Sequence, residues 1–441
     1  MTRVLIVGAG PAGIRAAQRL VAAGFQPIVI DEGVRAGGQI YRRPPEGFSR
    51  PPKKLYGAEA GKAVKLHWLF DGMVANGQVD YHPQSSVHAL RDGVAHVDGR
   101  QIPYDRLILA TGASDRLVPV PGWQQAGVYT LGAAQIALKA QGVALGRRVV
   151  LAGSGPLLTL VATQLLAAGA GVAAVLDTAP LRDQIRGGIG MALARPVVTA
   201  RGALMRARLR GIYHAGVRLD RIESDVIHWR DSRDTARVTE CDAVALGWHL
   251  RAETQLADLV GAEFSWSPAW AQWLPVADAM GRAGPGLYLA GDSLRIAGAD
   301  GAEVAGALAA NACLNDLGHV TPDSGLLLAR AARLQRFAVS VARAFPWPSG
   351  QLDALPDDTV LCRCEGVTAG QARETAIRTG PEANRVKSLT RVGMGRCQGR
   401  YCALAAADLI ARQAGVKMCE VGRLRGQPPV RPVVMADILR R

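Results

Sequence analysis

Two strand-glycine-helix segments constrain the fold of this chain more than any other feature. The first begins near the N-terminus, where the apolar run Val4 to Val7 leads into Gly8-Ala-Gly10-Pro-Ala-Gly13 and an Ala-rich stretch. In a βαβ unit these glycines allow a tight turn, a close approach of the backbone to a pyrophosphate and close helix packing, while helix N–H groups face the phosphates. The sequence therefore predicts an α/β domain with a parallel sheet that binds a dinucleotide at its first turn.

A second apolar strand, from Pro27 to Ile30, ends at Asp31 and Glu32. Asp31 stands at the place where a carboxylate accepts a ribose hydroxyl. A single glycine motif is weak evidence, but three later segments strengthen it: Gly37-Gly38-Gln39, Leu107 to Gly112, and Leu287 to Asp292. The candidate dinucleotide-binding residues of this part are Gly8, Gly10, Gly13, Asp31, Glu32, Gly38, Gln39, Val87, Thr111, Gly112, Gly291 and Asp292.

The second strand-glycine-helix segment contains Gly153-Ser-Gly155-Pro, and its next strand ends in Asp177. Leu158 replaces the third glycine, so close packing of the helix is less assured. An acidic residue at 177 disfavours a 2'-phosphate, which favours NAD or another adenine nucleotide if anything binds here. The alternative is an empty unit that serves packing and subunit contacts.

Four of the seven cysteines fall into two close pairs, Cys362 with Cys364 and Cys397 with Cys402. Four thiolates can bind zinc as a structural site or iron as a 2Fe-2S cluster. Zinc ribbons favour two residues between the cysteines of a pair, whereas here one residue and four residues intervene, which favours iron. A structural zinc or unligated thiols remain the alternative.

The residues around these cysteines suit a redox centre. Arginine neighbours would stabilise the extra negative charge of a reduced cluster, and glycines would let the backbone curl closely around sulfur. The arginines are Arg363, Arg391, Arg396 and Arg400, and the glycines are Gly393, Gly395 and Gly399.

Composition narrows the function classes. The formal net charge is +15, mostly from arginine, but without interleaved aromatic residues or a nucleic-acid motif it indicates acidic protein partners or cluster charge compensation, and not nucleic acid. Residues 149–176 carry no charge, yet Gly153 to Pro156 breaks the run, so a buried strand-helix-strand is predicted in place of a membrane span. The chain enters its first strand without a secretory signal, and we expect a cytoplasmic protein.

The set of motifs resembles two-dinucleotide-domain flavoproteins of the glutathione-reductase type, and the motifs follow the order found there. This resemblance implies FAD in the first domain, with Asp292 accepting a ribityl hydroxyl. The Cys-x-x-Cys that disulfide reductases carry beside the flavin is absent from the sequence, as are Ser-His-Asp arrangements and metal-binding His pairs. We therefore expect no catalytic residue on this chain, only cofactor chemistry.

The whole chain is similar to the A-type (α) flavoprotein component of bacterial heteromeric amine dehydrogenases, which include opine oxidases, hydroxyproline and proline dehydrogenases, and hydrogen cyanide synthase. The most telling segments are Gly37-Gly-Gln-Ile-Tyr-Arg-Arg-Pro-Pro45 and Thr390-Arg-Val-Gly-Met-Gly-Arg-Cys-Gln-Gly-Arg-Tyr-Cys402, with Cys362-Arg-Cys364-Glu. The resemblance implies a ferredoxin-like 2Fe-2S domain ligated by Cys362, Cys364, Cys397 and Cys402.

The predicted organisation has five parts. Residues 1–115 and 250–320 form the FAD-binding domain, and residues 116–249 form the second dinucleotide-type domain. Residues 321–355 form a connecting helix and linker, and residues 356–441 form the iron-sulfur domain.

The resemblance also implies partners. Family members oxidise the amino acid at an FAD in a separate, D-amino-acid-oxidase-like β subunit, then pass electrons onward, in some members through FMN at the subunit interface. A small third subunit is compatible with this scheme, as is a peripheral membrane association through the electron acceptor. The expected function is electron relay through FAD and 2Fe-2S. The alternatives are a self-sufficient NADH-dependent reductase and a scaffold subunit with a structural metal.

Overall fold

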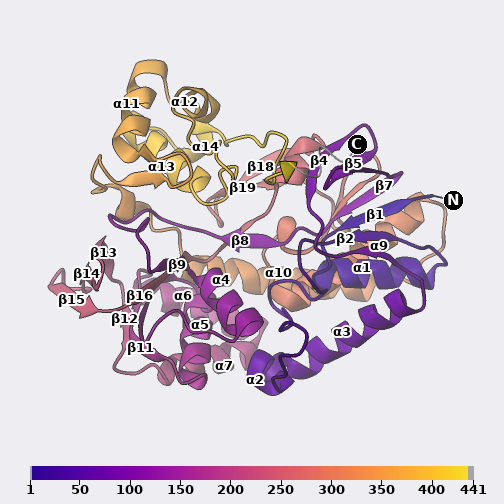
Figure 1. The fold of residues 1–441 in the computed structure, drawn as a ribbon, viewed down its shortest axis with the longest axis horizontal. Helices are drawn as coiled ribbons and strands as arrows, with labels where there is room; N and C mark the ends of the chain where they lie inside the picture. Colours follow the sequence, from indigo (N-terminus) through magenta and orange to yellow (C-terminus); the bar gives the residue numbers. More distant parts are fainter. Residues whose placement is uncertain (1, 436–441) are drawn as a thin grey trace.

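The computed structural model describes residues 2–435 and has two βαβ-type domains with a smaller C-terminal domain (Figure 1). The first domain is built on a sheet in the order β20-β21-β7-β1-β2-β3, in which all pairs are parallel except the edge pair of β20 with β21. Its strands are β1 (Val4–Val7), β2 (Ile28–Ile30), β3 (Asp80–His82), β7 (Arg106–Leu109), β20 (Arg282–Gly284) and β21 (Leu287–Leu289).

The two faces of this sheet have different covers. Helices pack on one face through an apolar core that includes Ile6, Ile14 and Phe70, and a small antiparallel sheet packs on the other through a core that includes Leu5 and Val97. The helices are α1 (Pro11–Ala22), α3 (Ala60–Ala75) and α9 (Gly298–Asp316); the small sheet is β4 (Val87–Arg91), β5 (Val94–Val97) and β6 (Arg100–Pro103). Short helical elements of this part are α2 (Pro52–Tyr56), η1 (Gly57–Glu59), α8 (Gln255–Leu259) and η3 (Gly291–Ser293).

The second domain repeats the plan with a parallel sheet in the order β12-β11-β10-β16-β9. The charge-free stretch from 149 to 176 forms most of β10, all of α5 and most of β11, so the prediction of a buried strand-helix-strand is confirmed.

None of the helices within residues 2–435 is both long and apolar enough to cross a bilayer. The elements of the second domain are β9 (Val128–Thr130), α4 (Leu131–Ile136), the π-helical turn η2 (Ala137–Gln141), β10 (Arg148–Ser154), α5 (Pro156–Ala167), β11 (Gly171–Asp177), α6 (Leu181–Ala194), α7 (Pro196–Ala207), β12 (Tyr213–Ala215), β13 (Arg218–Ile222), β14 (Val226–Arg230), β15 (Ala236–Glu240) and β16 (Ala243–Trp248).

Two antiparallel strands connect the domains. β8 (Ala113–Asp115) leaves the first domain and pairs with β17 (Leu250–Ala252), which returns to it. Figure 1 shows β8 running between the two domains below the C-terminal domain. A hairpin of β18 (Phe264–Ser267) and β19 (Gln272–Pro275) follows the return.

The long helix α10 (Gly325–Ala344) packs against α6 of the second domain and α9 of the first. Gly187 of α6 makes this contact close, since a Cβ there would lie 2.5 Å from the Cβ of Ala344. The helix forms where the sequence shows helical spacing of apolar residues and ends before Phe345-Pro-Trp-Pro, where proline stops a helix. α10 therefore packs on both dinucleotide-type domains, and the chain continues from it into the C-terminal domain.

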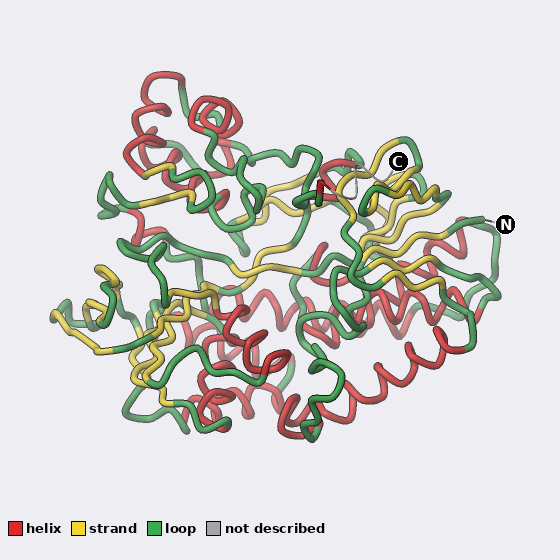
Figure 2. Tube along the Cα trace, in the orientation of Figure 1, coloured by secondary structure: helices red, strands yellow, loops and turns green. Residues whose placement is uncertain are grey.

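The C-terminal domain is mostly helical (Figure 2). Its elements are η4 (Ser349–Leu352), β22 (Val360–Cys362), β23 (Val367–Thr368), α11 (Ala369–Thr379), α12 (Ala383–Thr390), α13 (Ala403–Ala414) and α14 (Met418–Val421). Thr368 and Gln371 form a capping box at the start of α11, which satisfies two backbone N–H groups of its first turn.

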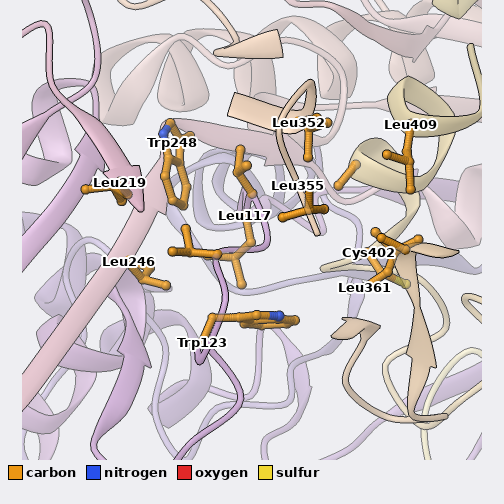
Figure 3. Packing of buried hydrophobic residues seen from close by; sticks show 14 of the residues in the cluster. Leu117, Trp123, Leu219, Leu246, Trp248, Leu352, Leu355, Leu361, Cys402 and Leu409 are labelled. Carbon is orange, nitrogen blue, oxygen red and sulfur yellow. The ribbon is translucent and has the colours of Figure 1, made fainter. Parts of the chain in front are cut away.

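This small domain shares one apolar core with the second dinucleotide-type domain (Figure 3). Leu246 and Trp248 from β16, together with Trp123 from the loop before β9, belong to the same cluster as Leu361, Cys402 and Leu409. The indole N–H of Trp123 also donates to the carbonyl of Val360 at 2.6 Å. The shared core and this hydrogen bond thus anchor the cysteine-bearing segments on the second dinucleotide-type domain.

Candidate functional site

The first glycine turn has no room for side chains. A Cβ at Gly8 would lie 2.3 Å from the carbonyl oxygen of Ala110 at the end of β7, and Gly8 has φ +108°. A Cβ at Gly13 would lie 1.8 Å from the carbonyl oxygen of Gly8. These contacts bring α1 directly onto β1, as the sequence predicted.

The Gly-Gly-Gln turn packs against the first glycine turn at Gly10. A Cβ at Gly38 would lie 2.9 Å from the Cα of Gly10, so the two turns face each other through backbone alone. Gln39 is exposed, and its side-chain oxygen accepts from the Nε of Arg42 at 3.2 Å. The pair of glycines leaves a cradle that any side chain at either position would fill, which is what a pyrophosphate needs.

The carboxylate that ends β2 is held by the same turn. The Oδ2 of Asp31 accepts the N–H of Ala9 at 2.5 Å, and its Oδ1 accepts the N–H of Gly33 at 2.6 Å. Burial raises the pKa of Asp31, and the two N–H groups oppose this rise. Glu32 is exposed and forms an ion pair with Arg431.

The other predicted residues of this domain fall at different distances from the glycine turn. Val87 begins β4 and is a core residue with 4% exposure. Gly291 packs on α1, since a Cβ there would lie 2.9 Å from the Cβ of Ala12. The Oδ1 of Asp292 accepts the N–H of Ala297 at 3.0 Å, just before α9, and burial raises the pKa of this partly exposed carboxyl.

Thr111 and Gly112 connect this site to a residue that the sequence patterns did not single out, Glu253. The Thr111 hydroxyl donates to the Glu253 carbonyl at 2.7 Å, and the Glu253 N–H donates to the Gly112 carbonyl at 3.0 Å. The Glu253 carboxylate in turn accepts from the Nε of Arg400 at 2.5 Å, and Arg400 donates to the carbonyl of Cys397 at 3.0 Å. A continuous chain of hydrogen bonds therefore runs from the Thr111 segment to the cysteine loop.

The four predicted cysteines come together as two thiol pairs. Cys362 hydrogen-bonds Cys402, and both are buried, whereas Cys364 hydrogen-bonds Cys397 nearer the surface. The bond from Cys402 is the main cause that lowers the pKa of Cys362, to about 6. No three described His, Cys, Asp or Glu side chains converge as ligands of one ion. Each pair takes one cysteine from each of the two sequence motifs, so the fold brings the four predicted cysteines to one region.

Backbone N–H groups point at these sulfurs. Gly393, Glu365 and Cys364 donate to Cys362, which lowers the pKa of its thiol. Gly395 allows the close approach, since a Cβ there would lie 2.3 Å from the Cβ of Cys364. Donors aimed at sulfur stabilise thiolate ligands, so the loop fits a thiolate-bound centre.

The arginines next to the cysteines in sequence do not all do what the sequence predicted. Arg363, Arg391 and Arg396 are exposed, and Arg391 forms an ion pair with Glu365 at 2.7 Å. Exposed charges are screened by water, so they act only weakly on a buried site. Arg400, the fourth of these arginines, donates to the Cys397 carbonyl, and a cation from elsewhere in the chain also lies against the loop: Arg251, which donates to the carbonyls of Gly399 and Arg400, both at 2.9 Å.

The second glycine turn has a histidine beside it. Gly153 keeps the role of a first glycine, since a Cβ there would lie 1.8 Å from the carbonyl oxygen of Gly247. Gly155, however, faces His249, whose Cα and ring carbon Cδ2 would lie 3.4 and 3.5 Å from an added Cβ. Leu158, at the third-glycine position, is fully buried in the core of the domain.

Asp177 is also occupied by protein. Its Oδ1 accepts the N–H of Ala179 at 2.8 Å, and its Oδ2 bonds the Tyr213 hydroxyl and the Gln184 amide. Burial raises the pKa of this carboxyl to about 7. A carboxylate that is 1% exposed and has these partners is not presented to a ribose.

Comparison with known proteins places the chain. The model of the pyridine nucleotide-disulphide oxidoreductase family matches residues 2–312, and that of the sarcosine oxidase A3 domain matches residues 365–439. The chain belongs to the pyridine nucleotide-disulphide oxidoreductase family. This membership confirms the predicted α/β fold with two dinucleotide-binding domains and implies FAD, for which the first glycine turn has a fitting cradle.

The similar proteins of full length are subunits of larger enzymes. The chain is 37% identical to the A-type subunit of opine oxidase from Rhizobium meliloti, covering 99% of this chain and 86% of that one. It is 36% identical to the corresponding opine oxidase subunit of Agrobacterium tumefaciens strain Ach5, over 99% and 91% of the two chains. It is 31% identical to hydrogen cyanide synthase subunit HcnB of Pseudomonas aeruginosa, over 98% and 97%.

The chain thus belongs with these opine oxidase A subunits, and it is an FAD-dependent oxidoreductase of their family. Among solved structures, L-proline dehydrogenase from P. horikoshii matches 99% of this chain and 80% of its own, with a TM-score of 0.72 at 20% identity. Thioredoxin reductase from T. acidophilum matches 72% of this chain with a TM-score of 0.51. These two structures support the fold alone.

Proposed function

We propose that this chain is the electron-transfer subunit of a heteromeric amino- or imino-acid dehydrogenase of the opine, hydroxyproline or proline type. It would relay electrons from a catalytic β subunit through FAD and a 2Fe-2S cluster to an acceptor. The observation that carries this proposal is the hydrogen-bonded connection from Thr111 through Glu253 and Arg400 to Cys397. One chain thereby holds a dinucleotide cradle and a four-thiol loop in fixed relation, as a relay needs.

The residues divide the work between two sites. Gly8, Gly10, Gly13 and Gly38 would admit the FAD pyrophosphate, while Asp31 would bind ribose and Asp292 the ribityl chain. FAD, when bound, accepts an electron pair and can release the electrons singly, and a 2Fe-2S cluster carries one electron at a time. The protein's part is to position both groups and supply N–H donors and charge, because no catalytic side chain is proposed.

The substrate would be oxidised on another polypeptide. Similar chains are named as subunits of opine oxidase and hydrogen cyanide synthase, which supports a partner that holds the amino-acid pocket. By the family resemblance that partner would be an FAD-containing, D-amino-acid-oxidase-like β subunit, with FMN at the interface in some members. We favour a secondary amine as the substrate class, on that resemblance.

The cluster assignment is tested by Cys397→Ser in the chain purified with its partner. We expect loss of cluster absorbance and of electron transfer to an external acceptor, with FAD still bound. Loss of FAD as well would mean that the cysteines mainly support folding. Elemental analysis that finds zinc and no iron in the wild-type protein would favour the scaffold alternative.

The relay assignment is tested by mass spectrometry of the protein that co-purifies with this chain from its native host. A stoichiometric second flavoprotein would support the relay. An isolated chain with flavin and iron that NADH reduces would favour a self-sufficient reductase. Two features argue against that alternative: His249 lies beside Gly155, and the Asp177 carboxyl is already hydrogen-bonded to Ala179 and Tyr213.

A further inference from the structure

Arg251, on β17, is an arginine without a carboxylate partner at the edge of the cysteine loop. Its guanidinium donates to two neutral carbonyls, those of Gly399 and Arg400, and is only partly reached by solvent. Within residues 2–435 no aspartate or glutamate lies within ion-pairing distance of it. Enclosure by protein lowers the pKa of Arg251, while the charges of Glu253, Cys402 and Cys397 raise it.

The nearby carboxylates already serve other cations. Glu253 pairs with Arg400 at 2.5 Å and lies 3.9 Å from Arg431. Asp258 accepts from both terminal nitrogens of Arg423, at 2.6 and 2.7 Å. Of these two carboxylates, Glu253 is the one whose charge acts on Arg251, and Arg400 and Arg431 share it.

Two further cations add to the local excess of positive charge. Arg116 is 3% exposed, and donates only to the carbonyls of Trp248 and Trp270. Burial, and then the charge of Arg251, lower the pKa of Arg116 to about 9. Lys387 is 4% exposed and donates to the Arg425 carbonyl at 2.7 Å, and its charge interacts first with Asp258 and then with the Cys402 thiol.

An enclosed cation is unfavourable unless a negative charge compensates it. With neutral thiols at the four cysteine positions, this excess would be compensated only in part, by the Glu253 charge that Arg400 already binds. Four thiolates around iron carry net negative charge, and they would lie next to Arg251.

We propose that Arg251 is the counter-charge of an anionic, cysteine-ligated centre and that it stabilises the reduced form of that centre. The inference rests on the proposed function. Reduction adds one electron, supplied by the reduced flavin, and no proton, so the centre gains one negative charge. A cation held beside Cys397 and Cys402 favours that state more than the oxidised one. Arg251 does not touch substrate and acts as a positioning and charge-compensating residue.

The test compares Arg251→Gln with Arg251→Lys in the chain purified with its partner. The glutamine keeps an N–H donor for the loop carbonyls but has no charge, whereas the lysine keeps the charge. The midpoint potential of the cluster is measured by a redox titration followed by electron paramagnetic resonance. We expect Arg251→Gln to lower the equilibrium constant for reduction at least tenfold, a shift of about 59 mV to more negative potential. Arg251→Lys should retain most of the wild-type potential.

Arg396→Gln is the matched control. Arg396 neighbours Cys397 in sequence but is exposed, so screening by water should leave the potential within a third of the shift caused by Arg251→Gln. An equal effect of the two glutamine variants would overturn the special role of Arg251.

Other outcomes separate this inference from the proposed function. An unchanged potential in Arg251→Gln, with iron and spectrum intact, would overturn the inference and leave the relay standing. If Arg251→Gln loses the metal and Arg251→Lys retains it, the charge requirement is supported; equal loss in both would mean that Arg251 only holds the loop. Zinc in the wild-type protein would overturn the relay, and metal retention in the two variants would still test the counter-charge.

Discussion

In each dinucleotide-type unit a parallel strand lies beside the glycine turn: β7 in the first unit and β16 in the second. The residue just after that strand that corresponds in the two units is Gly112 in the first and His249 in the second. The correspondence follows from the carbonyls that meet the first glycine, Ala110 beside Gly8 and Gly247 beside Gly153. Both residues have a positive φ, +74° for Gly112 and +66° for His249. The backbone path is therefore the same, but in the second unit an imidazole lies over the turn.

The carboxylates that end the second strands differ in the same sense. Asp31 accepts one backbone N–H from the first glycine turn, that of Ala9, and one from its own turn, that of Gly33, and remains partly exposed. Asp177 is 1% exposed, and Tyr213 and Gln184 occupy its second oxygen. A shared sequence plan thus supports a nucleotide cradle in one domain and a packed scaffold in the other, because the residues that fill the space come from elsewhere in the chain.

The most disruptive test of this comparison is Gly13→Ala. The added Cβ would lie 1.8 Å from the Gly8 carbonyl oxygen, so α1 must move away from β1. Such overpacking costs about 1–3 kcal/mol or more, and the moved helix would no longer meet the phosphates. We expect loss of bound FAD, measured as the flavin-to-protein absorbance ratio. Normal flavin content would show that the first turn tolerates a side chain at the third-glycine position, as the second turn does with Leu158.

Leu158→Ala is the reciprocal change in the second unit. Leu158 is fully buried, and removing a buried leucine side chain leaves a cavity, so we expect a loss of about 2–5 kcal/mol in the free energy of unfolding. Urea denaturation measures the loss, and the flavin ratio should remain that of the wild type. A loss of flavin with retained stability would mean that the second unit takes part in flavin binding.

Replacing each of the two carboxylates by asparagine should affect FAD binding differently. Asp31→Asn should weaken FAD binding, whereas Asp177→Asn should not. Burial raises the pKa of Asp177 from 3.8 to about 7, so the folded state holds the proton more tightly than the unfolded state. Its contribution to stability is therefore present at low pH and is lost as pH rises from about 4 to about 7.

Urea unfolding of the wild type and Asp177→Asn across that pH range measures this contribution. The stability of the wild type relative to the variant should fall as pH rises and level off above the folded pKa. A constant difference across the range would mean that the Asp177 pKa is the same in both states.

The smallest expected effect is the response to NADH. Because His249 lies over Gly155 and Asp177 is occupied, we expect no saturable heat of binding in calorimetry and no bleaching of the flavin. Binding with bleaching would show that the second unit opens to a nucleotide, and would end the distinction between the two units.

The sequence predicted the repeated units well, because strand hydrophobicity and glycine turns are local. Residues 149–176 form the predicted strand-helix-strand, and Gly8 and Gly13 make the tight turn and the close helix contact expected of them. The degraded fingerprint at Leu158 was also visible. The sequence did not show that Asp177 is enclosed, because Tyr213 lies 36 residues further along the chain.

The cysteine site shows the same limit. The spacing of Cys362, Cys364, Cys397 and Cys402 identified them as one group, but of the four arginines next to them in sequence only Arg400 is enclosed at the loop. Arg363, Arg391 and Arg396 extend into solvent, whereas Arg251, which donates to Gly399 across 148 residues, lies against the loop. Proximity in sequence does not fix the direction in which a loop side chain points.

The sequence by itself determined the fold, the first dinucleotide cradle and the grouping of the cysteines, since each depends on a short pattern whose geometry is set by the backbone. Tertiary structure alone decided that His249 lies beside the second glycine turn. It also decided that the thiols form two pairs, and that Glu253 and Arg400 connect the cysteine loop to the Thr111 segment. The physical reason is that charge compensation and occupied space depend on side chains brought together from distant segments. Only the packing of the three domains sets those distances.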